Sequence, residues 1–187
     1  MQGAEPPRRR NAAATKAKIL AAAQQAFSEI GYSTTGIRHI ATQAGVDSAL
    51  VQRYFGSKAG LFEAALSDAI PNFESFNPRR EDFGTRLTSE FLAGFFDLRA
   101  QSMIVLATSD PEARNIAARV LQNAITPAAQ WLEGPNAEAR AMRLIMLATG
   151  FMLYTRQVQL MTPEAAVDNK TSAWLSRLLQ EIIERPE

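Results

Sequence analysis

Residues 37–58 read "IRHIATQAGVDSALVQRYFGSK", and their spacing predicts two short helices joined by a tight turn. Helices that cross at a wide angle need a small residue at their contact, and Ala41 fits this place. The turn needs a residue that tolerates positive φ, which Gly45 does at the least steric cost. Val51 then faces back toward the first helix. The stretch therefore predicts a helix-turn-helix motif.

The outer face of the second helix carries side chains that suit base pairs in the DNA major groove. They are Asp47, Ser48, Ala49, Gln52 and Arg53. Arginine can bind guanine through two acceptors, glutamine can pair with adenine, and alanine can contact the methyl group of thymine. Arg38 points to the same side, and Tyr54 adds a hydroxyl group. Lys58 follows the candidate cap Ser57, so this helix start offers N–H groups and an ammonium group to a phosphate.

Charge is divided unevenly along the chain, although the net charge of the 187 residues is only +1. Residues 1–60 hold eight basic and three acidic side chains, whereas the remaining residues hold 12 basic and 16 acidic ones. A basic head on an acidic body indicates that the head binds a polyanion. Chance clustering together with a solvated arginine tail is the alternative explanation.

The wider sequence indicates an all-α protein of about nine helices, since no segment shows sustained period-two alternation. Thr35, Asp47 and Ser57 are candidate helix caps, and Asp110-Pro111 opens a further helix that Pro127 should end or kink. The helices are expected at 15–30, 36–44, 47–54, 58–70 and 82–98, then before Asp110, from 111 to Pro127, at 137–160 and from 162 onward. Residues 71–80 read as a linker.

Residues of about 13 to 73 resemble the N-terminal domain of the TetR family of transcriptional regulators. The matching stretches are "ILAAAQQAFSEIGYSTTGIRHIATQAGV" and "YFGSKAGLFEAAL". The resemblance implies a three-helix DNA-binding head and a helical body that binds a ligand and forms dimers. By position it implies DNA contacts from Thr35, Arg38, Gln52, Arg53, Tyr54 and Lys58. The chain departs from the family pattern at Gln52, where tyrosine is usual, and at Ala49, where glycine is usual.

Three regions are expected from these observations. Residues 1–12 form a flexible basic arm, residues 13–73 form the DNA-binding domain with its helix-turn-helix at about 36–55, and residues 74–187 form the effector-binding and dimerisation domain. The arm contains three consecutive arginines and shows no apolar periodicity.

The body contains two apolar helical stretches whose role the pattern leaves open. A dimer interface of paired helices is predicted at Met142, Leu153, Trp174, Leu175, Leu178, Leu179 and Ile182, with the core of a monomer as the alternative. An apolar ligand pocket is predicted at Phe91, Phe95, Met103, Trp131, Met146, Phe151, Tyr154 and Gln157, although plain core is the commoner role of such a stripe.

The sequence thus predicts a cytoplasmic homodimeric regulator, most simply a repressor that a small, largely apolar ligand releases from a near-palindromic DNA operator. A DNA-binding regulator without an effector and a helical enzyme are the alternatives. The chain has no cysteine and a single histidine, and its acids are scattered, so we expect no catalytic site, metal or cofactor. No apolar run approaches the roughly 20 residues that span a bilayer, so no membrane partner is expected.

Overall fold

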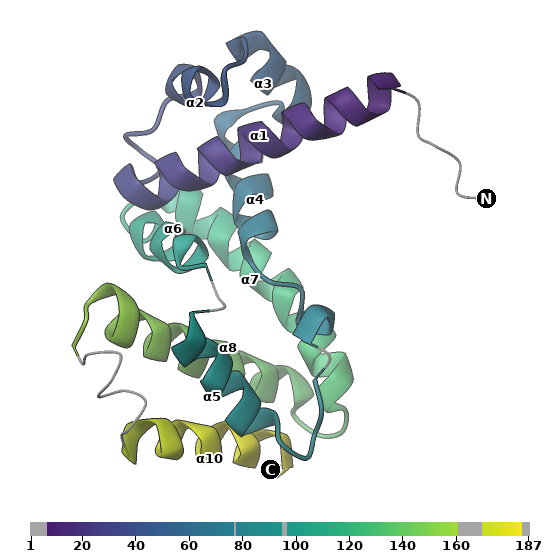
Figure 1. Ribbon diagram of the computed structural model, residues 1–187, viewed down its shortest axis with the longest axis vertical. Coiled ribbons are helices and arrows are strands. Elements are labelled where there is room, and N and C mark those ends of the chain that lie inside the picture. The colour runs from purple at the N-terminus through teal and green to yellow at the C-terminus, as the bar shows by residue number, and fades with distance from the viewer. Residues whose placement is uncertain (1–6, 77, 95–96, 161–169, 185–187) are drawn as a thin grey trace. The chain divides into compact units, whose positions relative to one another are not determined.

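The computed structural model describes residues 7–76, 78–94, 97–160 and 170–184. These residues form nine α-helices, and no strand occurs among them, which confirms the all-α prediction (Figure 1). The α-helices are α1 (Pro7–Ile30), α2 (Ile37–Ala44), α3 (Ser48–Phe55), α4 (Lys58–Ala69), α5 (Phe83–Ala93), α6 (Arg99–Ala107), α7 (Pro111–Leu132), α8 (Ala137–Met152) and α10 (Lys170–Glu184). A 3-10 turn, η1 (Phe73–Phe76), and a π-helical turn, η2 (Leu153–Gln157), accompany them.

The helices group into two compact units. Unit 1 comprises Met1–Ile70 and Arg99–Val120, and unit 2 comprises Pro71–Leu98 and Leu121–Glu187. The first break lies close to the boundary expected at residue 73, but α6 and the first half of α7 return to unit 1. Helix α7 therefore begins in unit 1 and ends in unit 2.

The start of α1 corrects the prediction of a flexible arm over residues 1–12. The helix already begins at Pro7, so residues 7–12 are helical, while residues 1–6 lie outside the described residues. Proline is favoured at the first helical position, because its missing N–H would have no partner there. The arginines and alanines that follow are good helix formers, so nothing interrupts the helix before Ile30.

An aromatic cluster joins α1 and α4 in unit 1. The ring of Phe62 packs edge-on against Phe27 and Tyr32, with both pairs of ring centroids 5.1 Å apart. The rings of Phe27 and Tyr32 stack at 6.0 Å. The same core takes in Ile40 and Val51, so the cluster supports the helix-turn-helix from behind.

The core of unit 2 depends on the close approach of α5 and α10. A Cβ atom at Gly84 would lie 2.0 Å from the carbonyl oxygen of Ser176, so only glycine fits against the α10 backbone. The N–H of Gly84 also donates to the Gln180 side chain at 2.9 Å. Leu175 and Leu179 are fully buried on the same side of α10. The contact is thus made of backbone as well as side chains.

A buried arginine caps the C-terminal end of α10. Arg140 is only 2% exposed, and its Nε and Nη2 atoms donate to the carbonyl oxygens of Ile182 and Ile183 at 2.8 and 2.7 Å. Its Nη1 donates to the carbonyl oxygen of Glu133 at 3.0 Å. The last carbonyls of a helix lack partners within it and carry partial negative charge. The guanidinium group supplies both hydrogen bonds and a compensating charge.

Several helix boundaries differ from those expected. Helix α5 ends at Ala93, since Gly94 takes the left-handed conformation well before residue 98. Helix α7 continues through Pro127 to Leu132, because Ala128, Ala129 and Leu132 beyond the proline are buried in the unit 2 core. The expected helix start at 162–164 lies outside the described residues.

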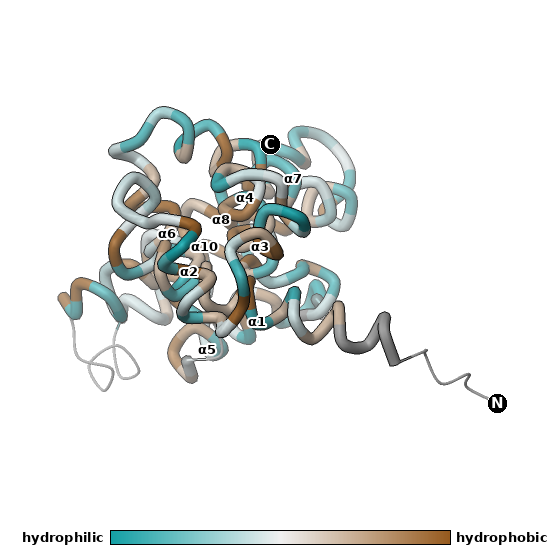
Figure 2. Tube along the Cα trace, turned by 90° about the horizontal axis from the view of Figure 1, so that it is seen from above, coloured by the Kyte–Doolittle hydropathy of each residue, from teal (hydrophilic) through white to brown (hydrophobic). Residues whose placement is uncertain are grey.

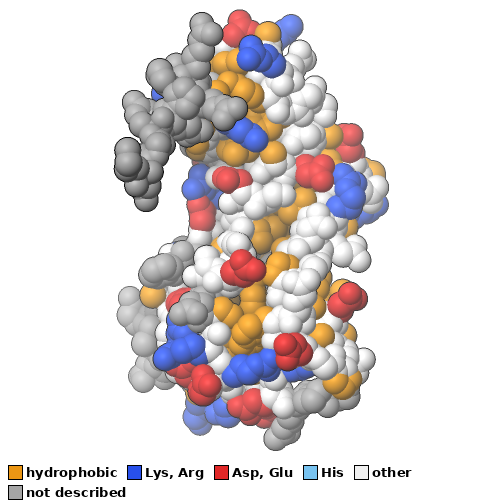
Figure 3. Space-filling view, turned by 90° about the vertical axis from the view of Figure 1, so that its right-hand side faces the viewer, with side chains coloured by type: hydrophobic (Ala, Val, Ile, Leu, Met, Phe, Trp, Pro, Cys, Tyr) orange, Lys and Arg blue, Asp and Glu red, His pale blue; other side chains and the backbone are white. Residues whose placement is uncertain are grey.

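The helices are amphipathic, and the colour in Figure 2 changes between teal and brown within single helices. On the face in Figure 3, basic and acidic side chains lie interspersed, with hydrophobic side chains exposed between them. Among the described residues, no helix is both long enough and apolar enough to cross a membrane.

We predict that Gly84→Ala destabilises the protein by about 1–3 kcal/mol, because the added methyl group collides with the α10 backbone. Gly150→Ala is the matched control, since a Cβ there has nothing within 4 Å. It should stabilise α8 by about 0.5–1 kcal/mol. Urea unfolding of both variants measures the difference, and equal effects would contradict the proposed close approach.

Candidate nucleic-acid interface

The turn between α2 and α3 has the geometry that the sequence predicts. Gly45 is left-handed, with φ 66° and ψ 37°, and its N–H returns to carbonyls at the end of α2. The N–H of Val46 donates to Ala41 at 3.0 Å. Asp47 then caps α3 by accepting the N–H of Ala49 at 2.7 Å. Three residues therefore end one helix and start the next.

Burial divides α3 into an inner and an outer face. Val51 is 1% exposed, and Ile40 and Ala41 of α2 are buried in the same core. Ala49, Gln52 and Arg53 are exposed. Because successive helical residues are about 100° apart, burying Val51 turns these three positions outward.

The predicted DNA contacts fall into three groups by burial. Arg38, Asp47, Ala49, Gln52 and Arg53 are exposed, whereas Ser48, Tyr54 and Lys58 are partly buried. Thr35 is 1% exposed, so the structure contradicts a DNA contact of its side chain. Its hydroxyl donates to the carbonyl oxygen of Gly31 at 2.6 Å, and Gly36 takes the N-cap position of α2 instead. Thr35 thus ties the turn to the end of α1 rather than capping α2.

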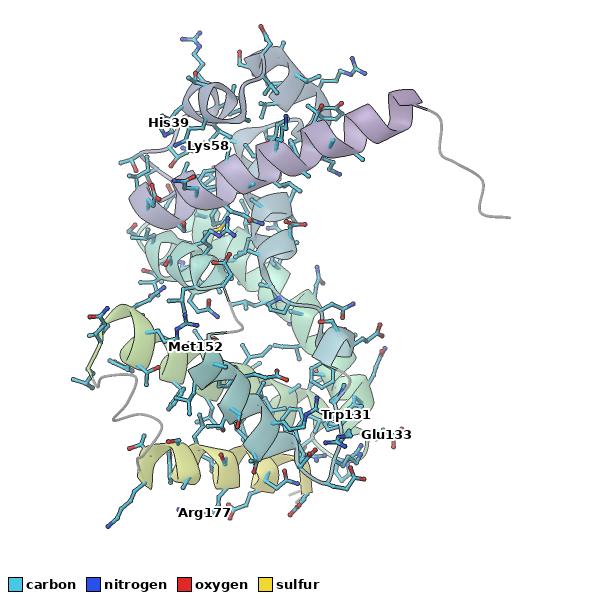
Figure 4. All side chains as sticks on the ribbon, viewed as in Figure 1. His39, Lys58, Trp131, Glu133, Met152 and Arg177 are labelled. Carbon is cyan, nitrogen blue, oxygen red and sulfur yellow. The ribbon has the colours of Figure 1, made fainter. Side chains whose placement is uncertain are left out.

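Lys58, labelled in Figure 4, contacts the turn that follows α1. Its Nζ donates to the carbonyl oxygen of Ser33 at 3.3 Å and lies 4.4 Å from the centre of the Tyr32 ring. The helix start itself is as expected, because the Ser57 hydroxyl accepts the N–H of Gly60 at 3.0 Å. The lysine is thus held by the head's own residues.

The start of α7 binds the same turn through two acids. The Tyr32 hydroxyl donates to Glu112 at 2.6 Å, and the Ser33 hydroxyl donates to Asp110 at 2.7 Å. Burial and the hydrogen bond to Glu112 raise the pKa of Tyr32. The Ser33 hydroxyl holds the pKa of Asp110 below its ordinary value. Sequence reasoning assigned Asp110 only a capping role, which it also fills through the N–H groups of Glu112 and Ala113.

Two further positioning residues were missed. A Cβ at Gly60 would lie 2.3 Å from the carbonyl oxygen of Phe55, so glycine permits the tight passage from α3 to α4. Gln24 is 6% exposed and donates to Ala65 at 3.2 Å and to Asp68 at 2.8 Å, which ties α1 to α4. A glycine in the first turn of a helix and a glutamine on an apolar face are the signals that could have found them.

The residues predicted to line a ligand pocket do not gather at one place. Met103 is fully buried in the unit 1 core, which excludes it from a pocket in unit 2. Trp131 packs on Phe73, Phe83 and the Arg80 guanidinium group, and Phe95 lies outside the described residues. The Phe91 ring packs near Phe151 at 6.3 Å, and the Gln157 side chain donates to Leu98 at 3.2 Å. These apolar stripes serve mainly as core.

An open cavity of 340 Å³ does bring together Met146, Phe151 and Tyr154 of the predicted set. It lies in unit 2 among α8, η2 and α10, and its lining also includes Trp174 and Leu175 of α10. Met146 is 63% exposed and Tyr154 55%. The cavity is lined mostly by apolar side chains.

The predicted dimer residues divide between core and surface. Leu175, Leu179 and Ile182 are buried in the unit 2 core, so they pack within the chain, contrary to the prediction. Leu153 and Leu178 are partly buried. Met142 and Trp174 are exposed, at 43% and 49%. Within α10, Leu175, Leu179 and Ile182 lie on the buried side, whereas Trp174 lies on the exposed side.

Two family descriptions match the chain. Residues 19–65 match "Bacterial regulatory proteins, tetR family", and residues 81–183 match "Tetracyclin repressor-like, C-terminal domain". The first match contains the whole helix-turn-helix, and the second covers more than half of the chain.

The curated relatives are transcriptional regulators. HTH-type transcriptional regulator HbdR of Aromatoleum sp. (strain CIB) is 38% identical over 63 residues, which are 34% of this chain and 28% of that protein. HTH-type transcriptional regulator BetI 1 of Chromohalobacter salexigens is 27% identical over 95 residues, 51% of this chain and 44% of that protein. The chain therefore spans less than half the length of these relatives.

Solved structures share the fold. GusR of Salmonella enterica superposes with a TM-score of 0.68 at 18% identity, covering 91% of this chain and 96% of that one. FadR of Bacillus subtilis, solved in complex with stearoyl-CoA, gives a TM-score of 0.58 at 17% identity, covering 90% and 97%. At these identities the likeness concerns the fold alone.

We predict that Tyr32→Phe lowers the free energy of unfolding by about 1 kcal/mol at neutral pH, because the bond to Glu112 is lost. The raised pKa of Tyr32 also stabilises the folded state below its ordinary value of 10.0, and this contribution is lost as pH rises above that value. The variant should therefore lose less stability between neutral and alkaline pH than the wild type does.

Urea unfolding from neutral pH to above pH 10 tests this expectation, with Tyr154→Phe as the control because its side chain is 55% exposed. The same alkaline loss in wild type and Tyr32→Phe would refute the assigned role of the hydroxyl.

Proposed function

Since this chain belongs to the TetR family of bacterial regulatory proteins, we propose that it is a sequence-specific DNA-binding transcriptional regulator. In this proposal it acts in the cytoplasm as a homodimeric repressor. A small, largely apolar ligand releases it from a near-palindromic operator. The matched relatives are regulators, and this leaves the enzyme alternative without support.

The exposed face of α3 is the observation that carries the proposal. Ala49, Gln52 and Arg53 project from a short helix whose opposite side, at Val51, is buried against the rest of unit 1. A helix of this size fits the major groove, where arginine and glutamine can read guanine and adenine. Arg38 on α2 is also exposed and can place its guanidinium group near the phosphates that flank the bases.

The charge of the head supports binding to a polyanion. Residues 1–60 hold eight basic against three acidic side chains, whereas the remainder of the chain is acidic. The capped start of α4 adds the positive end of its helix dipole and the ammonium group of Lys58. Contacts of this kind to phosphates release counterions, so binding should weaken steeply as salt is added.

Exposed apolar side chains on unit 2 support dimerisation. Met142 and Met146 of α8 and Trp174 of α10 are 43%, 63% and 49% exposed. A self-complementary contact around a two-fold axis would cover them and present two reading heads to one operator. Met146 and Trp174 also line the 340 Å³ cavity, so the partner would cover that cavity as well.

A small apolar effector is supported by the cavity and by the fold. The volume lies in the range of small-molecule sites, and Phe151, Tyr154 and Trp174 form part of its wall. FadR, which shares the fold, was solved with stearoyl-CoA. The second candidate is a regulator without an effector, which the packing of Met103, Trp131 and Phe91 as plain core favours.

Selection from a random duplex pool at low ionic strength tests the proposal directly. Enrichment of a short palindrome would support it, and failure to enrich any sequence would refute it. A thermal-shift panel of apolar compounds then separates the two candidates. A compound that raises the melting temperature and weakens operator binding identifies an effector-responsive repressor.

We predict that Arg53→Ala weakens operator binding by roughly 1–3 kcal/mol and relaxes the base preference at one operator position. Lys58→Ala should weaken binding to all sequences alike, because a phosphate contact carries no base information. Fluorescence anisotropy against the operator and its single-base variants measures both effects. Equal loss of sequence preference in the two variants would contradict the roles assigned here.

We predict that Trp174→Glu shifts the protein from dimer to monomer, because dimerisation would have to take a charged carboxylate out of water at an apolar contact. Sedimentation velocity measures the mass, and binding to a palindrome should fall much further than binding to one half-site. Val105→Glu is the matched control, since Val105 is 40% exposed in unit 1. Dimers of unchanged stability in Trp174→Glu would place the interface elsewhere.

A further inference from the structure

We infer that Asp110, acting through Ser33, holds the Lys58 ammonium group within unit 1, so that DNA phosphate has to displace this arrangement. Asp110 is then a positioning residue that limits the affinity for DNA. The inference rests on the proposed function, because it concerns the availability of one phosphate-binding lysine.

The geometry links the three residues in a chain. Lys58 Nζ donates to the Ser33 carbonyl oxygen at 3.3 Å, while the Ser33 hydroxyl donates to Asp110 Oδ2 at 2.7 Å. The ammonium group also lies 4.4 Å from the centre of the Tyr32 ring, within the range of a cation–π contact. Tyr32 is itself fixed by its bond to Glu112 at 2.6 Å. The lysine thus rests on a turn that the start of α7 immobilises.

The electrostatics of the site favour the ionised carboxylate. The Ser33 hydroxyl lowers the pKa of Asp110 most, followed by the N–H groups of α7, and the charge of Lys58 lowers it further. Asp110 is therefore an anion at neutral pH and attracts the ammonium group. A DNA phosphate attracts the same ammonium group, so DNA competes for it with the Ser33 carbonyl group, which Asp110 holds in place.

Asp110→Asn separates this role from helix capping. Asp110 Oδ1 accepts the N–H groups of Glu112 and Ala113 at 2.9 and 3.0 Å, which begins α7. Asparagine is an equally good cap, and its side chain can still hydrogen-bond Ser33. The substitution removes the charge and keeps the local structure, which the melting temperature of the full chain verifies.

The experiment measures binding of the full-length chain to a labelled mixed-sequence duplex over a series of salt concentrations. D110N should bind roughly twofold to fivefold more tightly at low salt, the range expected for loss of one solvent-exposed charge interaction. Its plot of log affinity against log salt should also steepen, by at most about 0.9, the contribution of one phosphate contact. Folding stability alone would not change this slope.

Two controls test whether the effect passes through Lys58. In a Lys58→Met background, Asp110→Asn should give no gain in affinity. Glu63→Gln removes the same charge elsewhere in unit 1, where Glu63 lies 3.4 Å from Arg119, and should leave affinity unchanged. A gain that persists without Lys58, or an equal gain in Glu63→Gln, would overturn the inference.

A measurement without DNA distinguishes this inference from the proposed function. Acetic anhydride should modify Lys58 faster in D110N than in wild type, as peptide mass spectrometry can follow. Equal rates of Lys58 modification in D110N and wild type would show that Asp110 does not hold the ammonium group. They would leave the proposed DNA binding untouched. A wild-type chain that binds no duplex would overturn the proposed function and the competition together, whatever the labelling shows.

Discussion

The tight turn at Gly45 and the burial of Val51 together fix which side of α3 faces outward. Gly45 ends α2, and Asp47 caps α3 only two residues later. The link between the two helices is therefore too short to let α3 rotate freely. With Val51 buried in the core, Gln52 and Arg53 must point away from it. A shift of one residue rotates the helix by about 100°, and a shift toward the C-terminus would put the polar Gln52 in the place of Val51. The exposure of the reading face therefore follows from the turn and the buried valine together.

Local signals in the sequence were sufficient for this part of the fold. The caps Asp47, Ser57 and Asp110 could be identified because a capping side chain bonds N–H groups only two or three residues ahead. Thr35 shows where such reasoning fails. Its hydroxyl could accept an N–H at the start of α2 or donate to a carbonyl at the end of α1. Because the side chain is buried against α1, it donates to Gly31. At the N-terminus, the run of arginines suggested a solvated arm, but helix propensity after Pro7 prevailed.

Contacts between distant residues left no local signal. Tyr32 and Glu112 are 80 residues apart, and Ser33 and Asp110 are 77 apart, so neither pair could be proposed from spacing. The body raises a related difficulty, because core, interface and pocket all select apolar residues at helical intervals. Leu175 and Trp174 are neighbours in sequence, yet one is fully buried and the other half exposed. Only the packing of α5 and α8 around α10 separates their roles.

The energy of the contacts at the start of α7 bears on regulation. Among the described helices, α7 alone has residues in both units. Its first residues bind the Tyr32–Ser33 turn through two hydrogen bonds to carboxylates, and such bonds contribute roughly 1–3 kcal/mol each. Allosteric coupling energies are typically about 1–3 kcal/mol. In the proposed repressor, losing or keeping one of these bonds would therefore be enough to change the population of the DNA-binding state. The two hydrogen bonds between the start of α7 and the Tyr32–Ser33 turn are thus strong enough to favour one conformation of the head. They are also weak enough to break and form again.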